Sequence, residues 1–428
     1  MAGQEIKTET EKRPCRKPEL LAPAGDPERL RAAVAFGADA VYMGGGAYGL
    51  RAKAKNFSRA EMADGVALAH DHGVKVYVTA NIYAHNADFA GMAEYFRDLQ
   101  ALGVDALLIS DLGVFSVARE AAPEMELHVS TQANTTNVYS ARAWYGLGAR
   151  RVVAARELSL PELTELRAGL PADCGLEVFC HGAMCVSYSG RCLLSAALTG
   201  QEANRGACTQ PCRWKYALME ERRPGEYFPV EEDGRGTYLY NARDLCMIDR
   251  LPELLATGAD SLKIEGRMKT AFYVGTTTRA YREALDDYFT DPALYRDKLP
   301  YYRHLVGLAS HRAFSTGFFF GMPGPEGQSY ADGGYVREAD YVAVVTRGAG
   351  TGEVAVLEQR NRFFAGETLT VIPPQGAIFS QTIGTLTTEE GEAVEAAPHP
   401  RQVLLTAFDR PVEAGTLLCR ELPEEEKG

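Results

Sequence analysis

The sequence contains no long apolar run. The first residues, MAGQEIKTETEKRPCRK, are polar and lack the apolar core of a secretory signal peptide. No stretch approaches the roughly 18 consecutive apolar residues that a membrane-spanning helix needs. We therefore expect a cytoplasmic protein, in which cysteines stay reduced and a cluster of them indicates metal binding or catalysis rather than disulfides.

An excess of positive charge is also missing. The chain has 45 Lys and Arg residues against 57 Asp and Glu residues, which gives a net charge of −12. This balance argues against a protein that coats nucleic acid generally, although it is compatible with a local basic site. Hydrophobic residues make up 46% of the 428 residues, so the chain can bury a large core and form one large domain and one smaller domain.

The G-x-G-x-x-G loop of dinucleotide-binding proteins is absent, although strand-like and helix-like segments alternate from Glu19 to about residue 290. A glycine suited to end a helix precedes an apolar run at Gly37, Gly103, Gly148 and Gly258. The apolar strand-like runs are ELLAPAG, DAVYMGGG, VKVYVTAN, DALLIS, LHVSTQAN, RRVVAA, LEVFCH and DSLKIEG. Eight such units predict a TIM-like (β/α)8 barrel. A doubly wound open sheet is the alternative, but it is less favoured because the G-x-G-x-x-G loop is absent.

The composition changes near Asp291, after a long predicted helix. From Phe318 onward, short alternating runs rich in Gly, Val and Thr are separated by turn residues, which predicts a small antiparallel β-barrel. The predicted fold class is therefore α/β, with a TIM-like barrel followed by a small C-terminal β-barrel. We expect a disordered leader at 1–17, the TIM-like barrel at 18–315 with a Cys-rich insertion at about 182–246, and the small β-barrel at 316–422.

Polar side chains on four of the predicted strands share one face by alternation. They are Tyr77, Thr79, Asn81, Ser130, Gln132, Glu177, His181, Lys263 and Glu265. In a TIM-like barrel such residues surround a site at the carboxyl-terminal mouth. The simpler interpretation is a partly polar core in which Lys263 pairs with Glu177 or Glu265. Cys180 falls on the opposite face, so we expect it to be a buried core cysteine.

Cysteines are concentrated after the seventh predicted strand, at Cys185, Cys192, Cys208 and Cys212, and Cys246 precedes the eighth. Four thiolates in separate segments are typical of an iron–sulfur cluster. Zinc also accepts four thiolates, but its structural sites usually contain paired C-x2–4-C segments, and here only CTQPC has that form. A third alternative is a nucleophilic Cys185 paired with His181, although nothing in the sequence orients the histidine.

The segment EVFCHGAMCVSYSGRCLLS, residues 177–195, resembles the signature of the peptidase U32 (collagenase-like) family. The runs ELLAPAGDPERLRAAVAFGADAVYMGG, RAKAKNFS and KIEGRMK are similar to that family as well, so the resemblance covers nearly the whole chain. It implies an oxygen-independent hydroxylase rather than a protease, because some members hydroxylate tRNA or ribosomal RNA bases and others act in ubiquinone synthesis.

The resemblance also implies a cofactor. It implies a [4Fe–4S] cluster held by Cys185, Cys192, Cys208 and Cys246, with Cys212 as a substitute ligand. The additional C-terminal domain resembles the branch that converts wobble uridine of tRNA to 5-hydroxyuridine and requires prephenate.

Local charge is consistent with an RNA substrate. The predicted mouth loops carry positive side chains that can hold phosphates or a dicarboxylate, at Arg51, Lys53, Lys55, Arg191, Arg205, Arg213, Lys215, Arg267 and Lys269. Phe57, Tyr188 and Trp214 lie among them and are candidates for stacking on an unpaired base. An ordinary solvated loop surface is the alternative.

We therefore expect a redox enzyme whose partners are the anticodon loop of tRNA and prephenate, with no membrane and no obligate protein partner. The expected catalytic residues are Glu177, His181, Lys263 and Glu265. The expected substrate-binding residues are Arg51, Lys53, Asn81, Gln132, Arg191 and Arg267. The alternatives are a U32-type peptidase, an Fe–S hydroxylase of a ubiquinone precursor, and a non-catalytic RNA-binding module.

Overall fold

The structure is a computed structural model that describes residues 16–49, 56–185, 187–214, 218–219, 227–228, 242–323 and 335–423. Its contacts divide the chain into two compact units. The first comprises residues 1–26, 39–267 and 314–333, and the second comprises residues 27–38, 268–313 and 334–428. No helix in the described ranges is both long and apolar enough to cross a bilayer.

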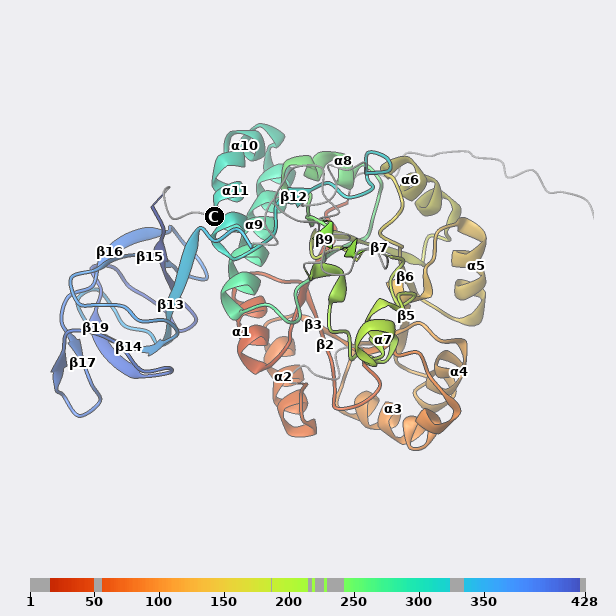
Figure 1. Ribbon diagram of the computed structural model, residues 1–428, viewed down its shortest axis with the longest axis horizontal. Helices are drawn as coiled ribbons and strands as arrows, with labels where there is room; N and C mark the ends of the chain where they lie inside the picture. The colour runs from red at the N-terminus through yellow and green to blue at the C-terminus, as the bar shows by residue number, and fades with distance from the viewer. Residues whose placement is uncertain are drawn as a thin grey trace, which may run out of the picture. The chain divides into compact units, whose positions relative to one another are not determined.

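Eight parallel strands close into a barrel in the first unit (Figure 1). They are β1 (Glu19–Pro23), β2 (Ala40–Met43), β3 (Lys75–Ala80), β4 (Ala106–Ile109), β5 (Glu126–Val129), β6 (Arg151–Val153), β7 (Gly175–Gly182) and β11 (Ser261–Ile264). Neighbours pair in chain order from β1 to β7, and β11 closes the ring by pairing with both β7 and β1. The predicted TIM-like barrel is confirmed.

The helices of this unit alternate with the strands. They are α2 (Arg59–Asp71), α3 (Met92–Ala101), α4 (Leu112–Ala121), α5 (Val138–Leu147), α6 (Leu160–Gly169), α7 (Leu194–Thr199) and α8 (Leu251–Leu255). Short 3-10 turns are η1 (Asn86–Phe89), η2 (Thr131–Ala133), η3 (Ala203–Arg205), η4 (Pro211–Arg213) and η5 (Ile248–Arg250). The four glycines predicted to end helices, Gly37, Gly103, Gly148 and Gly258, have φ values of 97°, 83°, 113° and 76°. Only glycine adopts this left-handed conformation without a steric penalty, which explains the repeated pattern.

Two short strands extend the barrel sheet beyond β7. Strand β10 (Asp244–Cys246) runs antiparallel to the end of β7, with Leu245 opposite Gly182 and Cys246 opposite His181. Strand β12 (Phe314–Ser315) pairs with β10. A separate pair, β8 (Leu218–Met219) and β9 (Tyr227–Phe228), lies between β7 and β10 in the chain. None of these four strands was expected from the sequence.

The second unit contains helices and an antiparallel sheet. Its helices are α1 (Pro27–Ala35), α9 (Ala271–Thr290), α10 (Pro292–Asp297) and α11 (Leu299–Leu308). Its strands are β13 (Ala339–Arg347), β14 (Val354–Gln359), β15 (Thr368–Ile372), β16 (Phe379–Thr382), β17 (Leu386–Thr387), β18 (Ala393–Val394), β19 (Val403–Ala407) and β20 (Leu417–Glu421). The sheet order is β16-β15-β20-β13-β14-β19-β17-β18, a half-barrel around a buried core that includes Val342, Leu357 and Leu404. The expected antiparallel C-terminal fold is confirmed.

Candidate functional site

A cavity of about 160 Å³ lies at the carboxyl ends of the barrel strands. Its wall is formed by residues that end β2, β3, β5, β6, β7 and β11 and by the loop that follows β7. The polar side chains that the strand ends contribute to the wall are Tyr42, Thr79, Asn81, Ser130, Thr131, Gln132, Arg156, Lys263, Glu265 and Arg267, and the loop contributes Ser187, Tyr188 and Gln210. Because the ends of parallel strands meet at one mouth of a barrel, residues far apart in the sequence converge here.

Glu177 lies below the cavity wall and neutralises two cations. Its Oε1 atom accepts a hydrogen bond of 2.8 Å from Nζ of Lys263, and its Oε2 atom lies 3.1 Å from Nη1 of Arg151. The Glu177 side chain is fully buried. Burial alone raises the pKa of this carboxyl, but Lys263 and Arg151 together hold it below its usual value. Glu177 is therefore a buried counterion, and the pairing with Lys263 is one of the two that the sequence suggested.

The charged network continues toward the amino ends of the strands. Arg151 also binds Glu19, at 2.5 Å, and Glu19 accepts hydrogen bonds from Tyr77 and Ser261. Each buried carboxylate thus faces a guanidinium or an ammonium group, which avoids the cost of an isolated buried charge. This network fills the interior of the barrel beneath the cavity.

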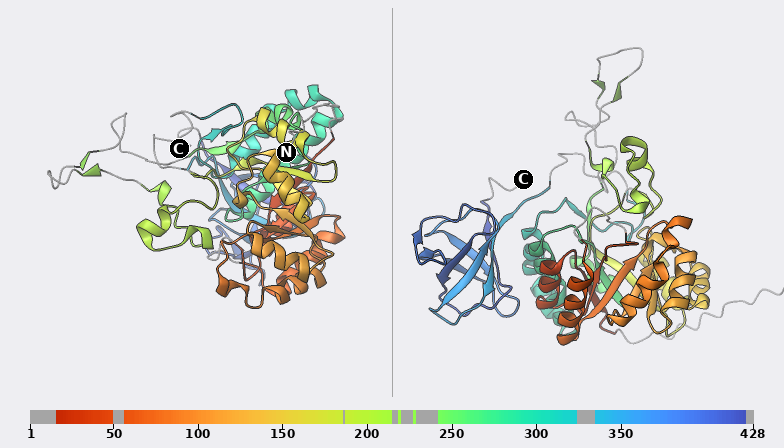
Figure 2. Two further views of the ribbon diagram at one scale, coloured as in Figure 1. Left: turned by 90° about the vertical axis from the view of Figure 1, so that its right-hand side faces the viewer. Right: turned by 90° about the horizontal axis from the view of Figure 1, so that it is seen from below.

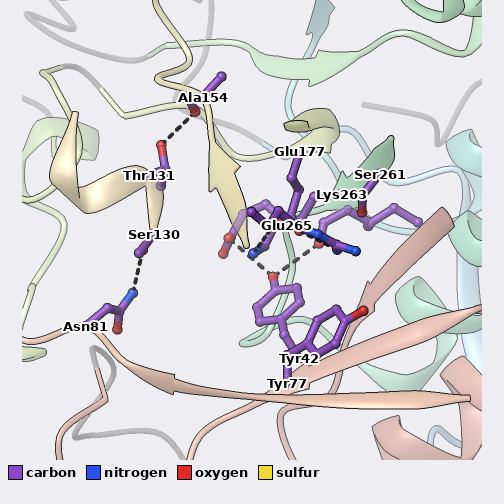
Figure 3. A network of polar contacts seen from close by, with 12 residues as sticks. Tyr42, Tyr77, Asn81, Ser130, Thr131, Ala154, Glu177, Ser261, Lys263 and Glu265 are labelled. Atoms are coloured by element: carbon purple, nitrogen blue, oxygen red, sulfur yellow. Dashed lines mark hydrogen bonds and ion pairs between the residues drawn. The ribbon is translucent and has the colours of Figure 1, made fainter. Parts of the chain in front are cut away.

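Glu265 is the carboxylate that lines the cavity. The hydroxyl of Tyr42 lies 3.3 Å from its Oε2 atom and 3.1 Å from the carbonyl oxygen of Ile264 (Figure 3). Nη2 of Arg156 lies 3.7 Å from the same Oε2 atom. Burial, and then the Glu265 charge, raise the pKa of Tyr42 well above its ordinary value, so the phenol stays protonated and donates its hydrogen bond.

Arg156 and Tyr42 were missed by the sequence reasoning. Arg156 donates a hydrogen bond of 2.7 Å to the carbonyl of Ala183, and its guanidinium lies 4.0 Å from the ring centre of Phe179. Both residues stand at the carboxyl ends of strands that were predicted correctly. The alternation that selected Lys263 and Glu265 would have found Tyr42 if it had been applied to β2, whereas Arg156 lies beyond the end of β6 and out of step with the inward-facing Arg151.

Arg267 is a second buried guanidinium in the wall, only 4% exposed. Its Nη1 atom donates to Oγ1 of Thr79 at 3.0 Å, and its Nη2 atom lies 3.5 Å from Oδ1 of Asn56. Near Thr79, at the end of β3, Nδ2 of Asn81 donates to Oγ of Ser130 at 3.1 Å (Figure 3). The cavity wall therefore carries both cationic groups and neutral amides and hydroxyls.

His181 does not belong to this wall. Pairing of β7 with β11 shifts from Phe179 opposite Lys263 to His181 opposite Ile264, which leaves Cys180 as an extra residue in a β-bulge. The bulge interrupts the alternation, so the prediction that His181 shares the face of Glu177 was wrong. His181 is buried, and its ring centre lies 5.4 Å from that of Phe314.

The Cys-rich loop begins at Gly182, where φ is 110°. A methyl group on this residue would lie 2.2 Å from the carbonyl oxygen of Glu265, so only glycine permits the close approach of the two strand ends. The loop with α7 then projects from one end of the barrel (Figure 2). Four of its thiols, those of Cys185, Cys192, Cys208 and Cys212, line the cavity.

The remaining cysteines lie elsewhere. Cys246 is on β10 and is absent from the cavity wall. Cys180 is fully buried, as expected, and burial, with a smaller contribution from Cys246, raises the pKa of its thiol well above the ordinary value. Within the described ranges, no three His, Cys, Asp or Glu side chains lie close enough together to hold a metal ion. The chemistry of the donors nevertheless fits a cluster, since four thiols face one cavity and a [4Fe–4S] cluster takes four.

The turn between Cys185 and Cys192 is fastened to the barrel by Asn134, which ends η2. Nδ2 of Asn134 donates to the carbonyl of Ser189 at 2.9 Å, and its Oδ1 atom accepts from Nε of Arg191 at 2.7 Å. Nη1 of Arg191 donates to the hydroxyl of Tyr83 at 2.5 Å. We call these contacts of Asn134, Arg191 and Tyr83 the loop clasp. The sequence reasoning included Arg191 and missed the other two.

The family models match nearly the whole chain. The model described as peptidase family U32 matches residues 25–329, and the model of the peptidase family U32 C-terminal domain matches residues 337–419. The chain belongs to peptidase family U32. The resemblance that the motif at 177–195 indicated is confirmed.

The U32 relatives include RNA-hydroxylating proteins. The chain is 38% identical over 404 residues to tRNA hydroxylation protein P1 of Bacillus subtilis (strain 168), which covers 94% of each chain. It is 36% identical over 421 residues to tRNA hydroxylation protein P of Escherichia coli (strain K12), covering 89% of this chain and 92% of the relative. It is also 38% identical over 268 residues to the 23S rRNA 5-hydroxycytidine C2501 synthase of Escherichia coli (strain K12), covering 63% of this chain and 39% of that protein.

Several residues that were expected at the mouth of this U32 protein have other positions. Phe57 is only 2% exposed, so the expectation that it stacks on a base was wrong. Both Nη atoms of Arg205 contact Asp88 at 2.8 Å, which neutralises that arginine. Nζ of Lys269 donates to the carbonyl of Ser310 at 2.9 Å. Residues 1–15, Arg51, Lys53, Lys55, Lys215 and the side chain of Arg213 lie outside the described part of the chain.

Proposed function

We propose that this U32 protein hydroxylates tRNA, converting wobble uridine to 5-hydroxyuridine with prephenate as co-substrate and a [4Fe–4S] cluster as cofactor. The observation that carries the proposal is the 38% identity, across 94% of the chain, to a protein named for tRNA hydroxylation. The polar, thiol-lined cavity supports it, because a base attacked at a ring carbon has to leave the stack and enter a pocket.

The cavity wall carries cationic groups that suit a small dicarboxylate. Arg156, Lys263 and Arg267 line it, and guanidinium and ammonium groups form the strongest hydrogen bonds with carboxylates. Lys263 is held by Glu177 at 2.8 Å, so its ammonium group keeps a defined position. These residues would orient prephenate, which carries two carboxylates.

The cavity wall also carries neutral groups that suit the base. Asn81, Ser130 and Gln132 line it, and amide and hydroxyl groups can both donate to and accept from the edge of uracil. Glu265, which Tyr42 contacts at 3.3 Å, is the carboxylate placed to accept a proton from a group bound in the cavity.

Hydroxylation replaces the C5–H bond of uracil with a C5–OH bond, so an oxygen donor and an acceptor of two electrons are required. Cys185, Cys192 and Cys208 would hold the cluster together with Cys246, or with Cys212 as a substitute. When bound, such a cluster supplies one-electron transfer, with a potential set by its burial and hydrogen bonds.

Nucleoside analysis of tRNA from a deletion strain tests the function. We expect 5-hydroxyuridine and its derivatives to disappear, to return with the wild-type gene, and to stay absent with Cys185→Ala. Unchanged levels of 5-hydroxyuridine derivatives in the deletion strain would refute the proposal that tRNA is the substrate. Anaerobic purification tests the cofactor, for which we expect about four irons per chain and absorption near 400 nm; a colourless protein containing zinc would refute it.

A peptidase is the second candidate, because the family description names that activity. A thiol peptidase needs a base beside its cysteine, but His181 lies outside the cavity that Cys185 lines. The peptidase hypothesis requires peptide cleavage by cluster-free protein, lost in Cys185→Ala and retained in Cys208→Ala. We expect no cleavage by cluster-free protein.

A further inference from the structure

Two exposed tyrosines and an arginine stand together at the mouth of the cavity. Tyr188 lines the cavity and is 47% exposed, and Tyr83 is 42% exposed. The backbone N–H of Arg191 donates to the carbonyl of Tyr188 at 3.0 Å, and its guanidinium lies 5.6 Å from the ring centre of Tyr83. We call Tyr83, Tyr188 and Arg191 the mouth platform.

Tyr83 and Arg191 are held in place although they are exposed. The backbone N–H of Tyr83 donates to the carbonyl of Asn204 at 3.1 Å, and the Tyr83 carbonyl accepts from Arg205 at 3.1 Å. Arg191 is fixed by Asn134 and by the Tyr83 hydroxyl through the loop clasp. Side chains that are already ordered lose little conformational entropy when a ligand binds, so these two residues are prepared for contact rather than merely exposed.

The charge of the platform is positive. Among the described residues, the side-chain hydrogen bonds of Arg191 go to neutral groups, the amide of Asn134 and the hydroxyl of Tyr83. Among the same residues Arg191 forms no ion pair, whereas the neighbouring Arg205 is neutralised by Asp88. The guanidinium of Arg191 can therefore contact an anion beside the Tyr83 ring.

We infer that the mouth platform binds an unpaired RNA nucleotide adjacent to the base that enters the cavity. Aromatic rings stack on bases, and an arginine beside them contacts the phosphate, which is how proteins usually bind unpaired RNA. The inference rests on the proposed function, from which it takes RNA as the ligand. It adds the site at which the RNA strand is bound. No part of it involves the cluster or the reacting atoms.

Fluorescence anisotropy with a labelled RNA hairpin that has an unpaired loop tests the inference on the full chain purified with its cofactor. We expect Tyr188→Ser to weaken binding about tenfold, because stacking contributes roughly 1–3 kcal/mol per base, whereas Tyr188→Phe stays within about twofold. Arg191→Gln should reduce the slope of log affinity against log salt by about one. Iron content and the thermal midpoint of each variant show whether the loop has kept its structure.

The chain offers a matched control in its second unit. Phe364 is 43% exposed and has the guanidinium of Arg362 4.9 Å from its ring centre. We expect Phe364→Ser to bind the hairpin as tightly as the wild type does. Equal affinities of Tyr188→Ser and Phe364→Ser would overturn the inference while the tRNA nucleoside result could still stand. The inference also falls if Tyr188→Ser weakens prephenate binding alone, since the platform would then belong to the co-substrate. Unchanged nucleosides in the deletion strain would instead refute the proposed function.

Discussion

Oδ1 of Asn134 accepts a hydrogen bond of 2.7 Å from Nε of Arg191, and this contact joins the barrel to the turn between the cavity cysteines Cys185 and Cys192. Asn134 has φ 54° and ψ 49°, a left-handed conformation that asparagine tolerates better than most residues. Its amide also donates to Ser189 at 2.9 Å. One side chain therefore sets the position of the turn between Cys185 and Cys192.

We predict that Asn134→Gly lowers the iron bound per chain and makes the chain more sensitive to trypsin at Arg191. Glycine keeps the left-handed backbone and removes both hydrogen bonds, so strain does not complicate the result. Asn137→Gly is the matched control, because Asn137 is the N-cap of α5 and the change to glycine costs only a few tenths of a kcal/mol there. Equal iron content and equal cleavage in the two variants would refute a positioning role for Asn134.

Glu177→Gln should destabilise the protein by about 3 kcal/mol at neutral pH, because it leaves Lys263 and Arg151 buried without their shared counterion. Urea denaturation measures the change. Glu253→Gln removes a partly exposed ion pair with Arg250 and should change stability by less than about 1 kcal/mol.

The stability difference between wild type and Glu177→Gln should depend on pH. The folded state holds the pKa of Glu177 below its unfolded value of about 4.3, so the carboxylate contributes stability above that pH. The contribution is lost as the pH falls through the lower, folded pKa. We expect the stability difference between wild type and Glu177→Gln to shrink below about pH 4. A difference that grows in acid would contradict the direction of the shift.

Cys246→Ala should lose iron, and Cys212→Ala should retain most of it. The antiparallel pairing of β10 with β7 holds Cys246 opposite His181. His181 lies four residues before Cys185 in the chain. Cys212 lies in the short turn η4, although its thiol lines the cavity. Iron per chain and the absorption near 400 nm after anaerobic reconstitution measure the result. Loss of iron in Cys212→Ala alone would assign the fourth ligand to Cys212.

Gly44→Ala should weaken prephenate binding by roughly tenfold, the cost of a lost charged hydrogen bond. A methyl group at Gly44 would lie 2.4 Å from Nη1 of Arg267 and would push this guanidinium away from Thr79. At Gly46 no atom of the described residues outside its chain neighbours lies within 4 Å of the added methyl group, so Gly46→Ala is the control and should bind as the wild type does. Calorimetric titration compares the two, and equal affinities would argue against Arg267 as a carboxylate ligand.

Local sequence patterns were sufficient to predict the barrel and several residues of its mouth. Repeated glycines and apolar runs specify parallel strands, since a buried strand needs apolar residues and a helix end favours glycine. Alternation placed Asn81, Gln132 and Lys263 on the inward face because a strand repeats every two residues. These rules act within a few neighbouring residues, so a single chain segment carries all the information they need.

Which of these residues come into contact depends on the packing of the folded chain. The bulge at Cys180 turned His181 away from the cavity, and such a bulge depends on how β7 pairs with β11. The loop clasp joins Asn134 to Arg191, residues separated by 57 positions, through contacts that no local pattern encodes. Strand pairing and close contacts arise from packing over the whole barrel. The folded structure was therefore needed to show that Glu177 is a buried counterion and that Glu265 lines the cavity.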